Sequence, residues 1–151
     1  MNDFFKRYAL LFIVLILVVC IYQYYFINDF KNSYHQKGVY TIGKIKSVES
    51  YGRGTGYNFI YNFNIGKKEY ESVCDIGGLS YSNARKKIDK NFLVIYLNND
   101  VHNNRIYSNI SIDTIIRNNQ ELKTEVDKNS KLKFKIDSIV PSPGYFLQNY
   151  F

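Results

Sequence analysis

Residues 8–27 read YALLFIVLILVVCIYQYYFI, and the interpretation of the whole chain depends on this stretch. Nineteen of its 20 residues are apolar, and Gln23 is the exception. A helix of about 20 residues is about 30 Å long, which matches the hydrocarbon core of a bilayer. Because a helix satisfies its own backbone hydrogen bonds in lipid, the run predicts one transmembrane helix.

Three other interpretations of this run compete with a membrane anchor. A buried core helix is rarely apolar on every face in so small a protein. Lys6 and Arg7 resemble the basic start of a signal peptide, but the apolar part of a signal peptide has about 7–15 residues and ends in small ones. The run here is longer and ends in QYYF at 23–26. A lipoprotein signal would place a small residue before Cys20, where the chain has Val19. An uncleaved signal-anchor is therefore favoured.

The charges on either side of the run predict its orientation. Lys6 and Arg7 stand directly before it, whereas Asp29 follows it and the next basic residues are Lys31 and Lys37. Lys and Arg favour the cytoplasmic side of a membrane. Residues 1–7 are therefore expected in the cytoplasm, with the rest of the chain outside it at the cell envelope.

The composition excludes several function classes. The chain has 151 residues, enough for one small domain and an anchor. Two Cys and two His supply neither a disulfide-rich scaffold nor a Cys-based zinc site, so no metal and no cofactor are expected. Asn, Lys, Ile, Tyr and Phe, which have AT-rich codons, make up 76 residues, and this bias predicts a bacterial, low-GC genome. The formal net charge of +7 is explained by the same bias.

The clearest strand pattern lies in residues 57–65. Apolar residues, most of them aromatic, occupy every odd position of this segment, and Asn or Ile occupies the even positions. Period two places the aromatic set on one face of a strand. Gly66 begins a turn, and residues 69–74 alternate again, with Cys74 on the inner face. The segment predicts a β-hairpin.

Shorter patterns predict the other elements. Residues 92–97, FLVIYL, are apolar throughout and predict a strand buried on both faces. Further strands are expected over residues 39–48, 105–112 and 132–140, and a bulge is expected at Gly43. Residues 80–88 predict a short helix capped by Ser80 or Ser82, and the helical spacing of 113–126 is ambiguous.

These patterns together predict an α+β chain built around a single transmembrane helix. The predicted parts are the cytoplasmic N-terminus 1–7, the transmembrane helix 8–27, a polar stalk 28–38, a strand-rich domain 39–140 with one or two short helices, and an aromatic tail 141–151.

The order of the motifs resembles that of a known group of proteins. It runs from a basic strand with Gly38 and Lys44-Ile45 through the hairpin with Gly66-Lys67 and a short helix to the FLVIYLNN run at 92–99 and Ser108. Over residues 38–110 this order resembles a broad family of uncharacterised bacterial membrane-anchored small β-domain proteins. The resemblance implies a half-open barrel beside a membrane. It implies no enzyme activity and supplies no catalytic residues.

Few residues suggest a site. The GRGTG segment at 52–56 carries Arg53 between Tyr51 and Tyr57, and these three residues are the predicted ligand-binding group. A phosphate-binding loop of the nucleotide-binding type needs a strand before it and a helix after it. Here an alternating strand follows, so a flexible loop between two strands is the favoured interpretation, and the three residues are the best-placed candidates for ligand binding in the chain.

Cys74 is the one candidate nucleophile of the predicted domain. It would need a base, and the two His residues lie in the stalk (His35) and in a turn (His102). An inert core cysteine is therefore expected, and no catalytic residue is predicted.

The sequence is compatible with three functions. The leading hypothesis is a non-catalytic domain that binds a partner protein at the cell envelope, tethered by residues 8–27 in the lipid bilayer. The alternative is a membrane-anchored immunity or antitoxin-type protein, and a third is a thiol-dependent hydrolase that uses Cys74. Nucleic-acid binding is not expected, because Lys131, Lys133 and Lys135 would line the solvated face of their predicted strand.

Overall fold

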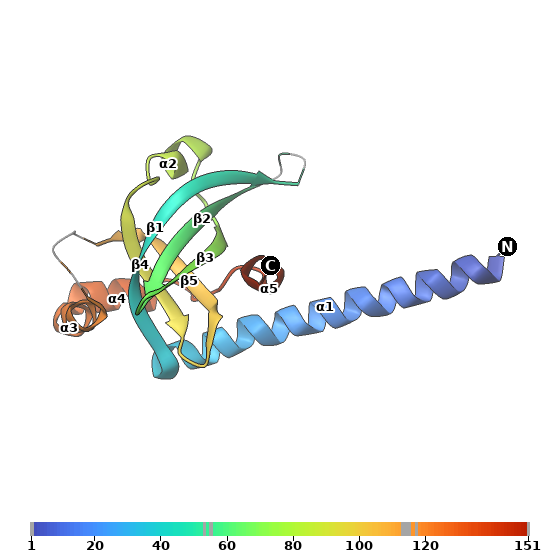
Figure 1. Cartoon of the computed structure of the whole chain (residues 1–151), viewed down its shortest axis with the longest axis horizontal. Helices are drawn as coiled ribbons and strands as arrows, with labels where there is room; N and C mark the ends of the chain where they lie inside the picture. Colours follow the sequence, from blue (N-terminus) through green and yellow to red (C-terminus); the bar gives the residue numbers. More distant parts are fainter. Residues whose placement is uncertain (1, 53, 55, 113–115, 117, 151) are drawn as a thin grey trace.

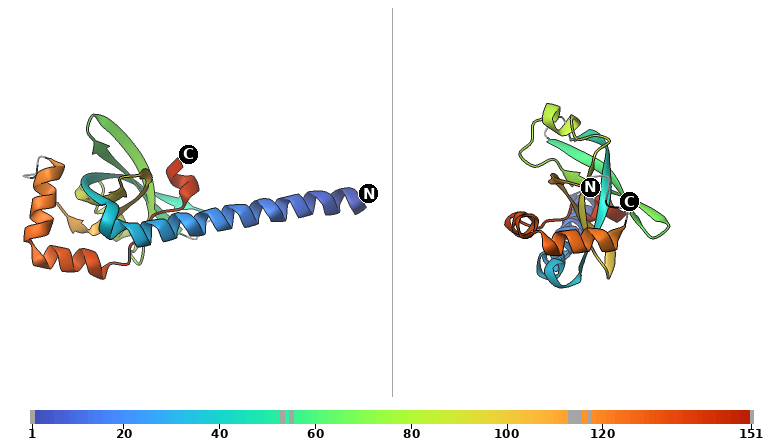
Figure 2. Two further views of the ribbon diagram at one scale, coloured as in Figure 1. Left: turned by 90° about the horizontal axis from the view of Figure 1, so that it is seen from below. Right: turned by 90° about the vertical axis from the view of Figure 1, so that its left-hand side faces the viewer.

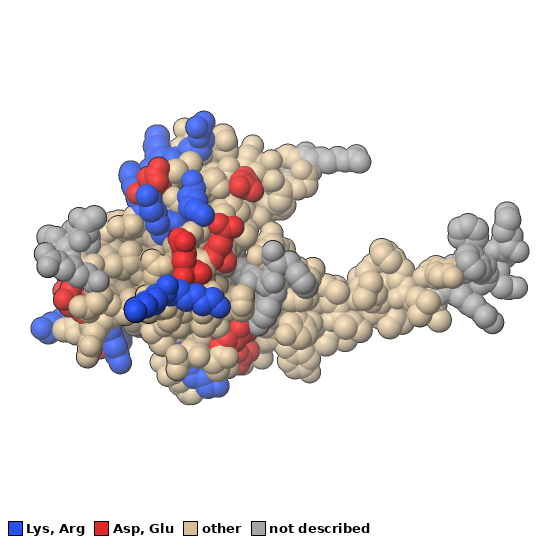
Figure 3. All heavy atoms as spheres, in the orientation of Figure 1, with Lys and Arg blue, Asp and Glu red and all other residues tan. Residues whose placement is uncertain are grey.

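The computed structural model describes every residue of the chain except 1, 53, 55, 113–115, 117 and 151. The first element, α1 (Asn2–Lys37), is a single helix of 36 residues that projects far beyond the rest of the molecule (Figure 1). The residues Leu10, Leu11 and Phe12 are each 64% exposed. From Tyr8 to the domain, the visible face of this projection carries no Lys, Arg, Asp or Glu (Figure 3). Among the described residues, α1 is the one helix long and apolar enough to cross a membrane.

Five antiparallel strands form the body of the domain. They are β1 (Gly38–Tyr51), β2 (Gly56–Ile65), β3 (Lys68–Asp75), β4 (Asn91–Leu97) and β5 (Asp100–Ser111), and their order in the sheet is β3-β2-β1-β4-β5. The sheet curls into a half-barrel, so that its two edge strands, β3 and β5, approach each other without pairing (Figure 1). The predicted α+β class and strand-rich domain are confirmed, as is the hairpin at 57–74.

The strand β4 separates two hydrophobic cores, which explains why six consecutive apolar residues are needed there. Phe92, Val94 and Tyr96 face the interior of the half-barrel, with the aromatic residues of β2. Leu93, Ile95 and Leu97 face the opposite side, where helices cover the sheet. All six residues are buried, as the sequence predicts.

Helices pack on the outer side of β4 and β5. They are the last turns of α1, with α3 (Asn119–Lys128) and α4 (Ser130–Ser138), which contribute Leu122, Val126 and Ile136 to the outer core. The short helix α2 (Tyr81–Arg85) begins after the N-cap Ser80, whose side chain accepts a hydrogen bond from Asn83 N at 3.3 Å. Both Figure 1 and the left view of Figure 2 place α3 at the end of the molecule farthest from the N-terminus.

The segment predicted as a stalk is part of α1. The helix continues without interruption to Lys37, and Phe30 and Tyr34 are buried against the sheet with their rings stacked at a centroid distance of 6.2 Å. One continuous helix, α1, therefore supplies both the exposed apolar segment and two residues of the outer core.

Three local predictions need correction. Residues 132–140 do not form a strand, since 130–138 are the helix α4; Leu132 and Ile136 are four residues apart, a spacing that suits a helix face as well as one face of a strand. The bulge of β1 lies between Ile45 and Ser47 and not at Gly43. With α5 (Phe146–Tyr150) the described residues contain four short helices, where one or two were expected.

Candidate functional site

The structure separates the two described members of the predicted loop site. Arg53 lies outside the described residues. Tyr51 is paired with Gly56 and Tyr57 with Ser50, so the two tyrosines point to opposite faces of the β1–β2 hairpin. The hydroxyl of Tyr51 donates to Asp75 Oδ2 at 3.0 Å, and a Cβ on Gly56 would lie 2.3 Å from the ring of Tyr51. Gly56 is therefore needed so that this ring can lie across the hairpin.

Tyr57 contributes to the packing of the inner core. Its ring lies 4.6 Å from that of Tyr81 on α2, and it packs against the buried residues of the half-barrel. Tyr51 and Tyr57 thus have different neighbours, and the ligand-binding role predicted for them stays a prediction.

Cys74 has the environment of a core residue. Its side chain is buried on the inner face of β3, and burial raises the pKa of the thiol. His35 lies 3.8 Å from Asp137 on α4, and the ring of His102 is 6.3 Å from that of Tyr70, so both imidazoles have neighbours other than Cys74. A thiol kept protonated by burial is a poor nucleophile.

The gap between the edge strands β3 and β5 is closed by the C-terminal segment. Arg105 of β5 donates from Nη1 to the carbonyl oxygens of Val140 and Ser142, at 3.2 and 2.9 Å. At the other end of this segment, Phe146 N donates to Gln23 Oε1 of α1 at 2.9 Å, and the ring of Phe146 lies 4.6 Å from that of Tyr22. The predicted aromatic tail therefore packs on the domain and on α1. Figure 1 shows α5 beside α1.

Two cavities remain in this gap. One has a volume of about 320 Å³ and is lined by residues of β3 and β5, Ile139 and the loop that follows β3. The other, of about 270 Å³, lies between α1, the sheet and the C-terminal segment. Both are lined by Cys74, Asp75, Gly77 and Arg105. Arg105 forms no ion pair with any described residue, although Asp75 lines the same cavities.

Edge strand β5 is protected by two lysines. Lys87 Nζ donates to Ser108 O at 2.9 Å, and Lys135 Nζ donates to Asn109 O. Burial lowers the pKa of Lys87, and the neighbouring charges of Lys90 and Lys135 act in the same direction. Lys87 follows α2 and Lys135 belongs to α4, and the two carbonyl oxygens of β5 that they bind are not available to a further strand.

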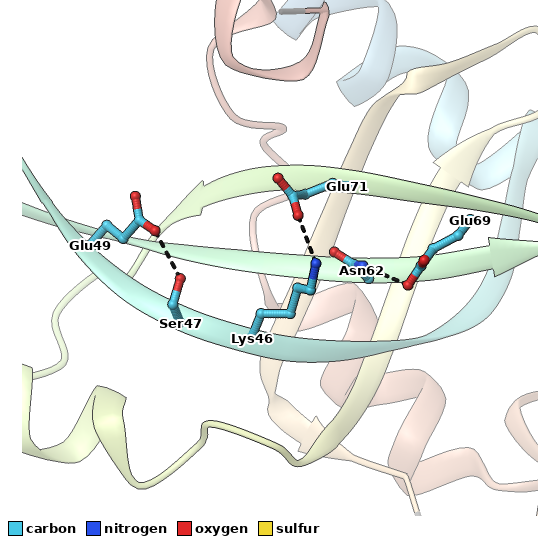
Figure 4. A network of polar contacts seen from close by, with 6 residues as sticks. All are labelled: Lys46, Ser47, Glu49, Asn62, Glu69 and Glu71. Carbon is cyan, nitrogen blue, oxygen red and sulfur yellow. Dashed lines mark hydrogen bonds and ion pairs between the residues drawn. The ribbon is translucent and has the colours of Figure 1, made fainter.

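The outer face of β1, β2 and β3 carries a network of polar side chains (Figure 4). Lys46 Nζ lies 3.0 Å from Glu71 Oε2, and Asn62 Nδ2 donates to Glu69 Oε1 at 2.6 Å. Glu49 accepts a hydrogen bond from Ser47 at 3.1 Å. The helices that cover the apolar outer face over β4 leave this polar part of the sheet exposed.

A groove of about 750 Å³ adjoins the network, between these strands and the first turn of α3. Lys44 and Asp89 form an ion pair of 2.9 Å beside it. Asn62 Oδ1 is buried in the groove without a hydrogen-bond partner among the described residues. The described residues contain no group of three His, Cys, Asp or Glu side chains that would hold a metal ion. The chemistry that this surface offers is hydrogen bonding and paired charge, which suits recognition of another polar surface.

Sequence reasoning missed Arg105, the partner of the C-terminal segment, because a single arginine in a strand carries no pattern. Gln23 did carry a signal, as the one polar residue of the apolar run, and the structure shows its contact with the tail. Lys46 and Glu71 come together only in the observed register of β1, β2 and β3, which includes the bulge of β1. A single sequence does not show this register.

Comparison of the chain with protein-family models, with curated proteins and with solved structures finds no match. The resemblance over residues 38–110 therefore stays a prediction.

Proposed function

We propose that the chain is a single-pass membrane protein whose domain lies outside the cytoplasm and binds a partner protein without catalysing a reaction. The observation that carries this proposal is the continuity of α1, which runs from a fully apolar, exposed stretch into the outer core of the domain. Exposed apolar side chains on every face of a helix are stable in lipid and costly in water. The helix would thus hold the domain at a fixed height above the bilayer.

The polar face of β1–β3 is the proposed contact with the partner. It is an exposed part of the sheet, and its groove leaves one buried acceptor, Asn62 Oδ1, without a partner among the described residues. Ion pairs as exposed as Lys46–Glu71 contribute little to stability, about 0–1 kcal/mol. These side chains are therefore available to exchange their partners when another protein binds.

A non-catalytic role is supported by the same geometry. The thiol of Cys74 is buried and has no adjacent imidazole among the described residues. The hydroxyl of Tyr51 and the carboxylate of Asp75 form a hydrogen bond with each other. These observations count against the thiol-dependent hydrolase.

The proposal is tested by photocrosslinking from the full-length chain in native membranes. A crosslinkable residue at Asn64, exposed beside the groove, is expected to capture one protein that a residue at Lys123 on α3 does not capture. Lys46→Glu and Glu71→Lys should each lower the yield about ten-fold, since each places like charges together and disturbs recognition.

The double swap, Lys46→Glu with Glu71→Lys, is the matched control for stability. It restores the ion pair within the chain but presents reversed charges, so the fold should recover while capture stays low. Equal capture from positions 64 and 123, or full capture by the double swap, would contradict the proposed face. A captured protein that is toxic without this chain would identify the immunity alternative.

A further inference from the structure

Two cavities meet where α1 enters the domain. The cavity of about 270 Å³ described above, called the chamber below, is lined by Gln23 of α1 and by Arg105, among others. A second, mainly apolar groove of about 470 Å³ lies between α1 and α5, against Val19, Cys20, Phe146 and Leu147. Gln23, Tyr145 and Gln148 line both, so the two spaces adjoin.

Two residues that line the chamber have buried N–H groups without an acceptor among the described residues. Gln23 Oε1 accepts a hydrogen bond from Phe146, but Gln23 Nε2 is buried and has no partner among the described residues. Arg105 Nε is also buried without a hydrogen-bond partner among the described residues, although Nη1 of the same guanidinium donates to two carbonyl oxygens. Buried donors are normally paired, so both indicate a missing acceptor.

The unpaired donors beside the chamber favour an anion. Arg105 has no carboxylate partner among the described residues. The carboxylate of Asp75 lines the chamber as well, but it already accepts hydrogen bonds from Tyr51 at 3.0 Å and from Gly77 N at 2.6 Å. These bonds occupy both oxygens of the carboxylate without neutralising its charge, so Arg105 Nε still lacks an acceptor among the described residues, and a phosphate or carboxylate is the group that a guanidinium binds best.

The apolar groove lies on the side of the chamber toward the N-terminus. Val19 and Cys20 precede Gln23 in α1, and the helix extends away from the domain in this direction (Figure 1; Figure 2, left). Leu147 is 46% exposed there, and the ring of Phe146 covers Tyr22. If α1 spans a bilayer, this groove faces the hydrocarbon and the chamber lies at the membrane surface.

We infer that the joined cavities bind one anionic phospholipid. Its phosphate accepts hydrogen bonds from Arg105 and Gln23, and one acyl chain lies in the groove between α1 and α5. The lipid would fasten the C-terminal segment to α1 and fill part of the space that remains between β3 and β5. This inference rests on the proposed membrane insertion of α1.

The test uses the full-length chain, purified in mild detergent and examined by native mass spectrometry with added lipids. Phosphatidylglycerol and phosphatidylcholine of the same acyl chains are compared, together with inorganic phosphate alone. Both lipids carry the phosphodiester, but the choline of phosphatidylcholine adds a cation that would lie near Arg105, so retention of phosphatidylglycerol is expected to exceed that of phosphatidylcholine about ten-fold. Inorganic phosphate should bind far more weakly, because it leaves the groove empty.

Three variants test the two halves of the site, and one serves as a control. Arg105→Gln and Gln23→Leu should each lower the retention of phosphatidylglycerol about five- to ten-fold, and Leu147→Asp should lower the retention of both lipids. Lys86→Gln removes an exposed charge on the far side of the domain, next to α2, and should change nothing. Thermal unfolding of each variant shows whether it is folded. Leu147 lies in the groove and not between β3 and β5, so Leu147→Asp still tests lipid binding if Arg105→Gln unfolds.

Several outcomes would overturn the inference. Equal retention of the two lipids, unchanged in Arg105→Gln, would remove the anion site. Phosphate binding as tight as that of the lipid would assign the chamber to a free anion. Crosslinking from position 147 to a protein in membranes would assign the groove to a partner helix. If alkaline extraction releases the chain from membranes, the proposed anchor itself fails; a chain that stays in the membrane but does not select lipids disproves only this inference.

Discussion

Asn103 Nδ2 of β5 donates a hydrogen bond to the main-chain carbonyl of Phe26 in α1 at 2.9 Å, and both residues are buried. Phe26 is the second-last residue of the apolar run at 8–27. The bond therefore fixes the sheet to α1 at the point where the helix changes from an exposed apolar rod to a packed core element. This bond and the packing of Phe30 and Tyr34 in the outer core hold the exposed part of α1 in a fixed position relative to the sheet.

Loss of this bond is expected to destabilise the domain. Asn103→Ala removes the donor and leaves space against α1, so the free energy of unfolding should fall by about 1–3 kcal/mol. Urea unfolding of the full-length chain in detergent measures this change. Asn99→Ala, in the exposed turn between β4 and β5, is the control and should stay within about 0.5 kcal/mol of the wild type. Equal effects of the two substitutions would show that the bond does not hold α1 to the sheet.

Charges in the middle of α1 should prevent its insertion into a membrane. An Arg at the centre of a membrane helix costs about 2.5–3.5 kcal/mol, so Leu15→Arg combined with Val18→Arg costs about 5–7 kcal/mol. The fraction of the chain that resists alkaline extraction should fall sharply. Tyr24→Arg with Tyr25→Arg is the matched control, because long side chains near the end of the run reach the interface and should leave most of the chain in the membrane. Membrane retention of the Leu15 and Val18 variant would refute a membrane-spanning role.

The sequence predicted the elements whose patterns are local and regular. The alternation at 57–65, the turn at Gly66 and the apolar run at 92–97 each have one physical solution, and all three form as expected. The segment at 132–140 has two solutions, because Leu132 and Ile136 fit both period two and a helix face. Packing of Ile136 beside Leu122 and Val126, which no local pattern records, decides for the helix.

The candidate sites depend on contacts between distant segments, and a single sequence does not record these. The bond from Phe146 to Gln23 joins residues 123 positions apart, and the contact of Arg105 with Ser142 joins the last strand to the tail. Of the group predicted at 51–57, Tyr51 and Tyr57 point to opposite faces of the hairpin, because strand pairing and not the local sequence sets their directions. The polarity of Gln23 was the one visible sign of the tail contact.

The stability of the domain should decline in alkaline solution. Burial raises the pKa of the Tyr61 hydroxyl and of the Cys74 thiol, so the folded state holds both groups neutral. Stabilisation from such groups is complete below their unfolded pKa values, about 8.5 for Cys and about 10 for Tyr, and is lost as the pH rises toward the folded values. Urea midpoints measured between about pH 7 and pH 11 should therefore fall above about pH 9.

Tyr61→Phe separates this effect from simple loss of packing. The hydroxyl of Tyr61 donates to Asn104 Oδ1, so the variant should lose about 1–2 kcal/mol near neutral pH. It should also lose less additional stability above about pH 10 than the wild type does, because one buried titrating group is gone. Alkaline curves that differ only by a constant offset would show that Tyr61 does not titrate during unfolding.

Gly43 is required by the packing of the inner core and not by a bulge. It pairs regularly with Phe63 and with Phe92, and a Cβ at this position would lie 2.4 Å from Val94 Cγ2. Gly43→Ala should therefore destabilise the domain by about 1–3 kcal/mol, the usual cost of overpacking a core. Gly78→Ala, where the new Cβ meets nothing within 4 Å, is the control and should be nearly neutral.

A double-mutant cycle tests whether Val94 is the cause. Val94→Ala alone creates a small cavity and should also destabilise the domain, by about 1–3 kcal/mol. In the double variant the methyl group introduced by Gly43→Ala occupies part of the space that Val94 leaves, so the total loss of unfolding free energy should be at least about 1 kcal/mol smaller than the sum of the two single losses. Strict additivity would mean that the cost of Gly43→Ala arises elsewhere, in the backbone of β1.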